Sequence, residues 1–269
     1  MDKATEVVIL AGGFGTRLQE IAEIKPKPMV TIGNYPILLH IISIYLNQGY
    51  SKFIVCGGYK VEAIREYFNN FQALNLDLHF KYKDNDTVSN EFIGSGMHEK
   101  LREILFTKSW EVQVIDTGLE ATTAGRLFAI KNKLEGNNFF CTYGDGVANV
   151  NLRELEEFHA AKKSIATVTA VHPPSRFGEI SISDGGLVLE FAEKPLGKSR
   201  INGGFFEFSK EIFTFLDPAK SLEEGLLANL TSKGKLHAFV HDGYWQNMDT
   251  VREMRILNEL WKSNQAPWI

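Results

Sequence analysis

Apolar and polar residues alternate along the first half of the chain in a pattern that predicts strands followed by helices. The apolar run "EVVILA" at residues 6–11 is typical of a buried strand, and "PILLHIISIYLNQG" at 36–49 predicts a helix with Pro36 in its first turn. The same order continues with strands predicted at 52–58, 76–82, 111–116 and 137–146 and helices at 60–71 and 125–134. Such alternation is typical of a parallel sheet covered on both faces, so we predict a three-layer α/β/α fold with a mainly parallel central sheet.

The second half of the chain starts in the same pattern and then changes. A helix is predicted at 151–163 and a strand at 164–171, whereas residues 176–209 read as short strands separated by glycine turns. A last helix is predicted at 250–261, where Thr250 and Glu253 have the spacing of a capping box. Residues 83–110 are polar and weakly patterned, so we expect a long excursion there that is partly helical.

Composition and charge exclude several classes of protein. Hydrophobic residues make up 44% of the 269-residue chain, which is enough for one large core, and the 23% of charged residues disfavours both a disordered tail and a membrane protein. The net charge of −4 disfavours binding to nucleic acid. Cys56 and Cys141 lie in apolar runs without metal-binding spacing, and no apolar run has the length of a signal or membrane segment. We therefore expect a cytoplasmic protein with neither a membrane nor a nucleic acid as its partner.

The first predicted strand is followed by "AGGFGTRLQEIAEIKPKPM" at residues 11–29. Glycines after a strand let backbone N–H groups converge on a phosphate, although glycine turns of this kind are also common as plain structural features. Arg17 and Lys27 favour the phosphate interpretation, because Pro26 and Pro28 restrict the backbone around Lys27. The spacing lacks the third glycine of the dinucleotide-binding motif and does not match a Walker loop. The stretch therefore predicts a site for a small anionic ligand.

Seven further motifs follow this stretch in a fixed order, namely "DTG…GRL" at 116–127, "TYGDGVAN" at 142–149, "RFGEI" at 176–180, "EKP" at 193–195, "INGGFF" at 201–206, "WQNMDT" at 245–250 and "APW" at 266–268. Together they resemble the signature of sugar nucleotidyltransferases over nearly the whole chain. The resemblance implies a Rossmann-like nucleotidyltransferase fold and an in-line displacement that joins a sugar 1-phosphate to a nucleoside triphosphate. It is strongest to members that convert CTP and α-D-glucose 1-phosphate into CDP-glucose and pyrophosphate. Use of UTP, dTTP or another sugar phosphate remains an alternative.

The resemblance also implies roles for individual residues. Arg17, Lys27 and Asp145 would be catalytic, and Asp145 and Asp249 would bind Mg²⁺, which prefers oxygen ligands. The implied nucleotide-binding residues are Leu10, Ala11, Gly12, Gly13, Phe14, Gly15, Thr16, Arg17, Lys27, Ala121 and Arg126. Ala121 departs from the family pattern, which has a hydroxyl side chain near the base, and Ala124 replaces a glycine. These two departures concern the contacts to the base.

The implied sugar-phosphate site involves Gly178, Glu193, Lys194, Asn202 and Gly203. Sugar recognition needs such polar groups because hydroxyls are distinguished by hydrogen bonds. We expect a single catalytic domain over 1–269, whose C-terminal part from about residue 176 covers this site, and assembly into a homo-oligomer.

Two other classes of function make different predictions about the sequence. An oxidoreductase that binds a dinucleotide would need the glycine motif that is missing here. A catalytically silent regulatory relative would have lost phosphate or metal residues, yet Arg17, Lys27, Asp145 and Asp249 are all present.

Overall fold

The central sheet of the protein has eight strands. The computed structural model describes residues 4–13, 25–76, 78–82, 88–92, 98–173, 179–192 and 199–269. The strand order is β13–β10–β14–β8–β1–β4–β7, and β15 also pairs with β10. The strands are β1 (Ala4–Ala11), β4 (Lys52–Gly57), β7 (Glu111–Asp116), β8 (Asn138–Tyr143), β10 (Ala166–Val171), β13 (Ile201–Asn202), β14 (Phe206–Ser209) and β15 (Leu236–His241).

The sheet is parallel in its first half and mixed in its second half. The pairs β1–β4, β1–β8, β4–β7 and β10–β15 are parallel, whereas β14 runs antiparallel to both β8 and β10, and β13 runs antiparallel to β10. The predicted α/β fold with a mainly parallel sheet is therefore confirmed. β14 is the strand that joins the β8–β1–β4–β7 half to the half that contains β10, β13 and β15.

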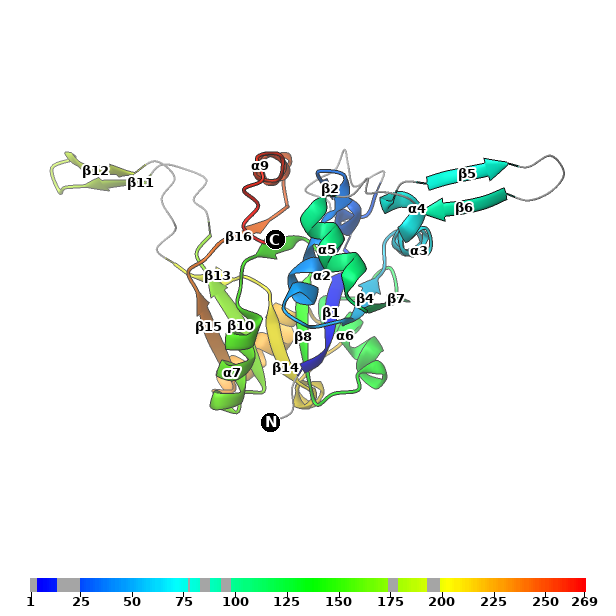
Figure 1. The fold of residues 1–269 in the computed structure, drawn as a ribbon. Coiled ribbons are helices and arrows are strands. Elements are labelled where there is room, and N and C mark those ends of the chain that lie inside the picture. The colour runs from blue at the N-terminus through cyan, green and yellow to red at the C-terminus, as the bar shows by residue number, and fades with distance from the viewer. Residues whose placement is uncertain are drawn as a thin grey trace.

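Helices cover both faces of this sheet (Figure 1). The α-helices are α2 (Ile37–Asn47), α3 (Val61–Asn69), α4 (Phe71–Asn75), α5 (Glu99–Thr107), α6 (Thr123–Ile130), α7 (Leu152–Lys162), α8 (Ala228–Ser232) and α9 (Val251–Lys262). Short 3₁₀ helices occupy Lys27–Met29, Lys131–Lys133 and Lys210–Thr214, and a π-helix occupies Leu222–Leu227. Within the described ranges, no helix is long and apolar enough to cross a lipid bilayer.

The two hydrophobic cores can be followed along β1. Val7 and Ile9 face the core formed with α2 and α5, whereas Val8 and Leu10 face the core formed with α6 and the π-helix. Successive side chains of a strand point to opposite faces of its sheet, so a strand that is apolar at every position must be covered on both sides. This is the physical reason for the three layers that the sequence predicts.

Two predicted helix boundaries can be compared with the structure. The capping box at the start of α9 is confirmed: the Thr250 hydroxyl accepts a hydrogen bond from the Glu253 backbone N–H, and the Glu253 carboxylate accepts one from the Thr250 N–H. The helix predicted at 125–134 instead becomes a 3₁₀ helix after Ile130. Residues 131–133 are all exposed, so no apolar face holds another α-helical turn against the sheet.

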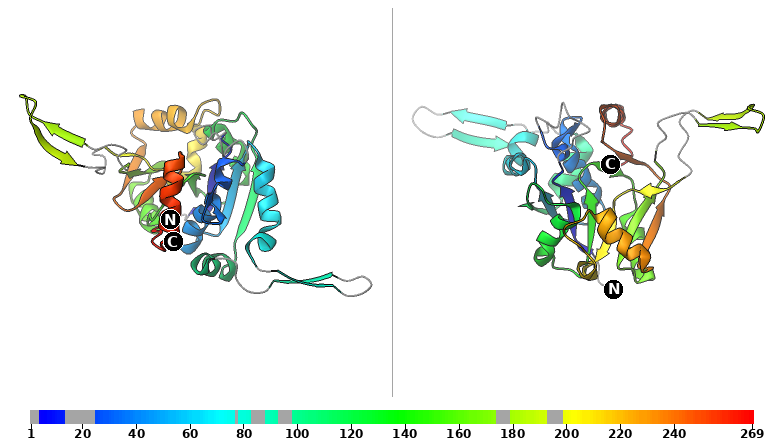
Figure 2. Two further views of the ribbon diagram at one scale, coloured as in Figure 1. Left: turned by 90° about the horizontal axis from the view of Figure 1, so that it is seen from above. Right: turned by 180° about the vertical axis from the view of Figure 1, so that it is seen from behind.

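Within the part of the chain that the structure describes, four pairs of short strands lie outside the central sheet. They are β2 (Thr31–Ile32) with β3 (Tyr35–Pro36), β5 (Leu78–Tyr82) with β6 (Val88–Phe92), β9 (Gly146–Ala148) with β16 (Trp245–Asn247), and β11 (Glu179–Ile182) with β12 (Val188–Ala192). The hairpins β5–β6 and β11–β12 project from opposite sides of the body (Figure 2). Strand β6 and helix α5 fall within the excursion predicted for residues 83–110, which is therefore partly helical as expected.

Candidate active site

A cavity of about 430 Å³ opens at the carboxyl end of the parallel strands. Strand β1 lies between β4 and β8, and the chain leaves β1 toward β4 on one side before it returns as β8 on the other. Ligands of open α/β sheets bind at such a switch point. The cavity is lined by Leu10, Ala11, Gly12, Gly13, Lys27, Pro28, Leu119, Glu120, Ala121, Thr123, Arg126, Tyr143, Gly144, Asp145 and Asp249.

Nine residues that the sequence assigns to the site are brought together around this cavity, namely Leu10, Ala11, Gly12, Gly13, Lys27, Ala121, Arg126, Asp145 and Asp249. Asn202 and Gly203 lie at the end of β13, next to Tyr143 of the cavity wall. Seven more predicted residues lie outside the described residues, namely Phe14, Gly15, Thr16, Arg17, Gly178, Glu193 and Lys194.

Arg126 of α6 forms one end of the cavity and is only 4% exposed. Its terminal nitrogens donate hydrogen bonds of 2.8–3.3 Å to the Thr117 hydroxyl and to the carbonyl oxygens of Gly12, Gly57, Gly118 and Leu119. A Cβ atom on Gly12 would lie 2.1 Å from Arg126 Cζ, so this approach requires glycine. The guanidinium thus ties the ends of β1 and β4 to the loop that follows β7.

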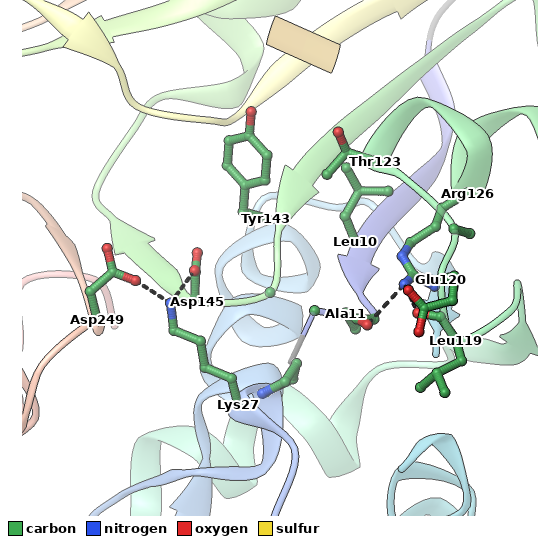
Figure 3. Close-up of a pocket in the computed structure, with 15 residues that line it drawn as sticks. Leu10, Ala11, Lys27, Leu119, Glu120, Thr123, Arg126, Tyr143, Asp145 and Asp249 are labelled. Atoms are coloured by element: carbon green, nitrogen blue, oxygen red, sulfur yellow. Dashed lines mark hydrogen bonds and ion pairs between the residues drawn. The ribbon is translucent and has the colours of Figure 1, made fainter. Parts of the chain in front are cut away.

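Lys27 forms the opposite end of the cavity together with two carboxylates (Figure 3). Its ammonium group donates to Asp145 Oδ2 at 2.5 Å and also to Asp249 Oδ1. The Lys27 side chain is 14% exposed and that of Asp249 is 16% exposed. Three charged groups from three distant parts of the chain therefore converge on one partly buried point.

The backbone explains how Asp249 reaches this point. β16 pairs with β9 so that Asn247 lies opposite Gly146, and the Met248 N–H donates to the Asp145 carbonyl at 2.8 Å. The chain beyond Asn247 therefore runs alongside Asp145. The Asp249 carboxylate also accepts a hydrogen bond from Asn247 Nδ2 at 2.6 Å, which fixes its orientation.

The charge balance around Lys27 favours a cation between the carboxylates. Burial acts to lower the pKa of Lys27, but Asp145 and then Asp249 outweigh it and raise the pKa above its usual value. Two carboxylates against one ammonium leave a formal charge of about −1 at this point. Their oxygen donors suit a hard divalent cation. Among the described residues, no group of three or more His, Cys, Asp or Glu side chains is placed to hold a metal ion.

The segment 201–204 is held against the cavity wall by side chains from other strands. Asn202 Nδ2 donates to the Tyr143 hydroxyl at 3.1 Å, and Trp245 Nε1 donates to the Gly203 carbonyl at 2.7 Å. Gly204 has a φ of +73°, which favours glycine, and a Cβ atom there would lie 3.1 Å from Tyr143 Cδ2. Tyr143 therefore touches this segment through both its hydroxyl group and its ring.

Sequence reasoning did not assign six residues that line the cavity, namely Pro28, Leu119, Glu120, Thr123, Tyr143 and Gly144. Tyr143 stands directly before Gly144 and Asp145, so its place at the end of a strand was the signal that could have identified it. Leu119, Glu120 and Thr123 lie inside the motif at 116–127, where the resemblance identified only Ala121 and Arg126.

Comparison with known proteins agrees with this geometry. The family model described as nucleotidyl transferase matches residues 6–258. The chain belongs to this nucleotidyl transferase family. The resemblance predicted from the sequence motifs is confirmed.

Two members of the nucleotidyl transferase family resemble the chain over nearly its full length. Glucose-1-phosphate cytidylyltransferase of Salmonella typhi is 41% identical over 266 residues, which cover 98% of each chain. The probable glucose-1-phosphate cytidylyltransferase of Bacillus subtilis (strain 168) is 36% identical over 265 residues, again covering 98% of each chain. Among solved structures, HddC from Yersinia pseudotuberculosis superposes with a TM-score of 0.64 and 22% identity, covering 96% of this chain and 100% of that chain. This last likeness concerns the fold alone.

Proposed function

We propose that the protein transfers the cytidylyl group of CTP to α-D-glucose 1-phosphate, giving CDP-glucose and pyrophosphate. The observation that carries the proposal is the identity of 41% to a glucose-1-phosphate cytidylyltransferase over 98% of both chains. The cavity agrees with this activity, because Lys27 and two carboxylates lie at one end and the loop that carries Leu119 and Glu120 lies at the other (Figure 3).

The reaction is an in-line displacement at phosphorus. A phosphate oxygen of the sugar phosphate forms a bond to the α-phosphorus of CTP, and the bond from that phosphorus to the bridging oxygen of pyrophosphate breaks. No covalent intermediate with the protein is needed. The chain must hold two anions together and stabilise the charge that develops on the leaving group, which requires positioning and fixed cations.

Lys27 is the described cation that serves this purpose in our proposal. Its raised pKa keeps the ammonium protonated, and two prolines fix the backbone on either side of it. When the triphosphate binds, the ammonium can exchange one carboxylate for a phosphate oxygen. We propose that Arg17, which lies outside the described residues, grips the triphosphate beside it.

Members of the nucleotidyl transferase family generally use a divalent metal. We propose that Mg²⁺ is bound by Asp145 and Asp249. Both carboxylates accept a hydrogen bond from the Lys27 ammonium group, so they already lie on either side of one positive charge. When bound, the metal would neutralise phosphate charge and orient the triphosphate. Asp145 and Asp249 would hold it, while Asn247 and the β9–β16 pairing keep Asp249 in place.

The sugar phosphate occupies the side of the cavity next to Asn202 and Gly203 in our proposal. Lys194 would contact its phosphate, and Glu193 with Gly178 would complete the pocket. These three residues lie outside the described residues. The whole chain would then act as a single catalytic domain, with the part after about residue 176 covering the sugar.

We also propose a cytoplasmic homo-oligomer. The hairpin β11–β12 forms a sheet of its own, although an isolated two-stranded hairpin is only marginally stable in water. It exposes the large apolar side chains of Ile180, Ile182, Leu187, Val188, Leu189 and Phe191. Burial of these side chains against a second copy would remove them from water. Light scattering coupled to size exclusion tests this, and a monomer at micromolar concentration would contradict it.

The activity is tested by measuring pyrophosphate release over a matrix of nucleoside triphosphates and sugar 1-phosphates in the presence of Mg²⁺. We expect CTP with glucose 1-phosphate to have the highest kcat/KM. A higher value for dTTP or UTP would replace the base assignment but keep the reaction class. A complete lack of pyrophosphate release would contradict the proposal.

A further inference from the structure

The hydroxyl group of Tyr143 connects two side chains that come from different parts of the chain. Tyr143 ends β8, Asn202 ends β13, and Glu223 lies in the π-helix Leu222–Leu227. The Tyr143 hydroxyl donates to Glu223 Oε1, and Asn202 Nδ2 donates to the Tyr143 oxygen at 3.1 Å. These contacts form a chain of hydrogen bonds from Glu223 through Tyr143 to Asn202.

The direction of every hydrogen bond in this chain is fixed by Glu223. An ionised carboxylate only accepts, so the single hydroxyl hydrogen of Tyr143 is directed to Glu223. The Tyr143 oxygen can then only accept, which turns the amide nitrogen of Asn202 toward it. Burial, with Glu223 as the second cause, raises the pKa of Tyr143 far above its usual value, so the hydroxyl keeps its hydrogen.

The other side of the Asn202 amide gives the same orientation independently. Asn202 Oδ1 accepts a hydrogen bond from the Gly204 N–H at 2.9 Å, and a backbone N–H can only donate. The amide is therefore locked from both sides. The hydrogen bond to Tyr143 uses one of the two hydrogens on Asn202 Nδ2. Because the amide is fixed, the second hydrogen also has a fixed direction and can be donated to a ligand.

We propose that Tyr143, held by Glu223, is a positioning residue that presents Asn202 as a hydrogen-bond donor to a hydroxyl group of the sugar phosphate. The inference rests on the proposed function, in which Asn202 contacts the sugar. It assigns a role to two residues that do not themselves need to touch the substrate. Without the Glu223 carboxylate, the Tyr143 hydroxyl could turn its hydrogen to Asn202, and only the Gly204 N–H would still hold the amide in this orientation.

The test compares Tyr143→Phe and Glu223→Gln with Glu224→Gln, which removes the same charge from the neighbouring exposed position of the π-helix. Steady-state rates are measured with CTP and glucose 1-phosphate. A lost neutral hydrogen bond should raise the KM for glucose 1-phosphate about fivefold in Tyr143→Phe and by a smaller factor in Glu223→Gln. The KM for CTP should stay within about twofold in both, and Glu224→Gln should resemble the wild type.

A double-mutant cycle with Asn202→Ala separates positioning from a general structural effect. If Tyr143 acts through Asn202, adding Tyr143→Phe to Asn202→Ala should change the KM for glucose 1-phosphate less than about twofold. Multiplying effects, or equal changes in both KM values, would overturn the inference and leave the proposed function intact. If the wild type releases no pyrophosphate from this substrate pair, both the inference and the proposed function fail.

Discussion

The nucleotide side and the sugar side of the proposed site are built in different ways. At the nucleotide end, Arg126 is almost fully buried and is fixed mainly by backbone carbonyl groups of the sheet and its loops. On the side where we propose that the sugar binds, Asn202 is exposed and is held by the Tyr143–Glu223 side chains together with the Gly204 N–H. In our proposal, a backbone scaffold would hold the part that every nucleotidyl transfer needs, whereas side chains would hold the part that selects the acceptor. Mutations on the two sides should therefore have different consequences for stability and for the two substrates.

The largest effect should come from the carboxylates beside Lys27. Asp145→Asn replaces a charged ligand by a neutral amide, so we expect kcat/KM to fall by at least ~10²-fold while the fold persists. Pyrophosphate release and circular dichroism measure the two quantities. Glu157→Gln, at an exposed position of α7, removes one carboxylate charge away from the cavity and serves as the control. Near wild-type activity of Asp145→Asn in Mg²⁺ would show that the metal site lies elsewhere.

Arg126→Lys tests the backbone scaffold at the nucleotide end. An ammonium group cannot reproduce the forked donors of arginine, so several buried carbonyl groups would lose their partners. We expect the free energy of unfolding to fall by about 2–4 kcal/mol, as measured in urea. Arg102→Lys, at an exposed position of α5, should change it by less than about 0.5 kcal/mol. Equal stabilities of the two variants would show that Arg126 is not a structural tie.

The strand that joins the two halves of the sheet carries a buried acid, Glu207 of β14. Its Oε2 atom has no hydrogen-bond partner among the described residues, and burial, with Glu156 as the second cause, raises its pKa to about 8. The folded state therefore binds this proton more tightly than the unfolded chain does. Stability should be full below the usual pKa of 4.5 and should fall as pH rises toward about 8.

Glu207→Gln removes this titration. We expect the variant to be more stable than the wild type by about 1–3 kcal/mol at pH 8.5 and to differ little near pH 4.5. Urea unfolding at several pH values measures the difference. A stability difference that does not change with pH would contradict the assignment. Glu207 does not line the cavity, so the Glu207→Gln variant should have the same kcat/KM as the wild type.

The smallest effect concerns the choice of base. Ala121 lines the cavity without a side-chain hydroxyl, so we expect the wild type to turn over some UTP beside CTP. Ala121→Thr should increase the preference for CTP over UTP by roughly threefold. One added neutral hydrogen bond contributes about 1 kcal/mol to the binding free energy, and only part of that distinguishes the two bases. The ratio of kcat/KM values for CTP and UTP checks this. If the wild type has no UTP activity and the ratio does not change, Ala121 is not near the base.

The nucleotide side of the proposed site can be predicted from the sequence better than the sugar side. The nucleotide end follows from local signals, because glycines and a proline-flanked lysine next to a buried strand indicate a phosphate site by themselves. The sugar end depends on contacts between residues that are far apart in the chain. No local sequence pattern connects Glu223 with Tyr143. The contacts of Lys27 with Asp145 and Asp249 cannot be predicted from a local pattern either, because the three residues are far apart in the chain.

The fold shows the same limit. The apolar runs predicted β1, β4 and β8 because these strands are buried on both faces, whereas β7 lies at the edge of the sheet and is partly exposed. Strand β15 was missed, since two histidines interrupt its apolar run, and the π-helix at Leu222–Leu227 has no simple sequence period. Both elements belong to the second half, where antiparallel and parallel neighbours alternate. The roles of the individual site residues remain predictions.

The central claim is that one cavity holds the nucleotide and the sugar at opposite ends, and binding measurements test it most directly. Calorimetric titration of CTP and of CDP-glucose into the wild type, Arg126→Lys and Asn202→Ala gives six affinities to compare. The account predicts that Arg126→Lys weakens both ligands, whereas Asn202→Ala weakens CDP-glucose by about fivefold or more and leaves CTP within about twofold. Equal weakening of CTP by both variants would contradict the account.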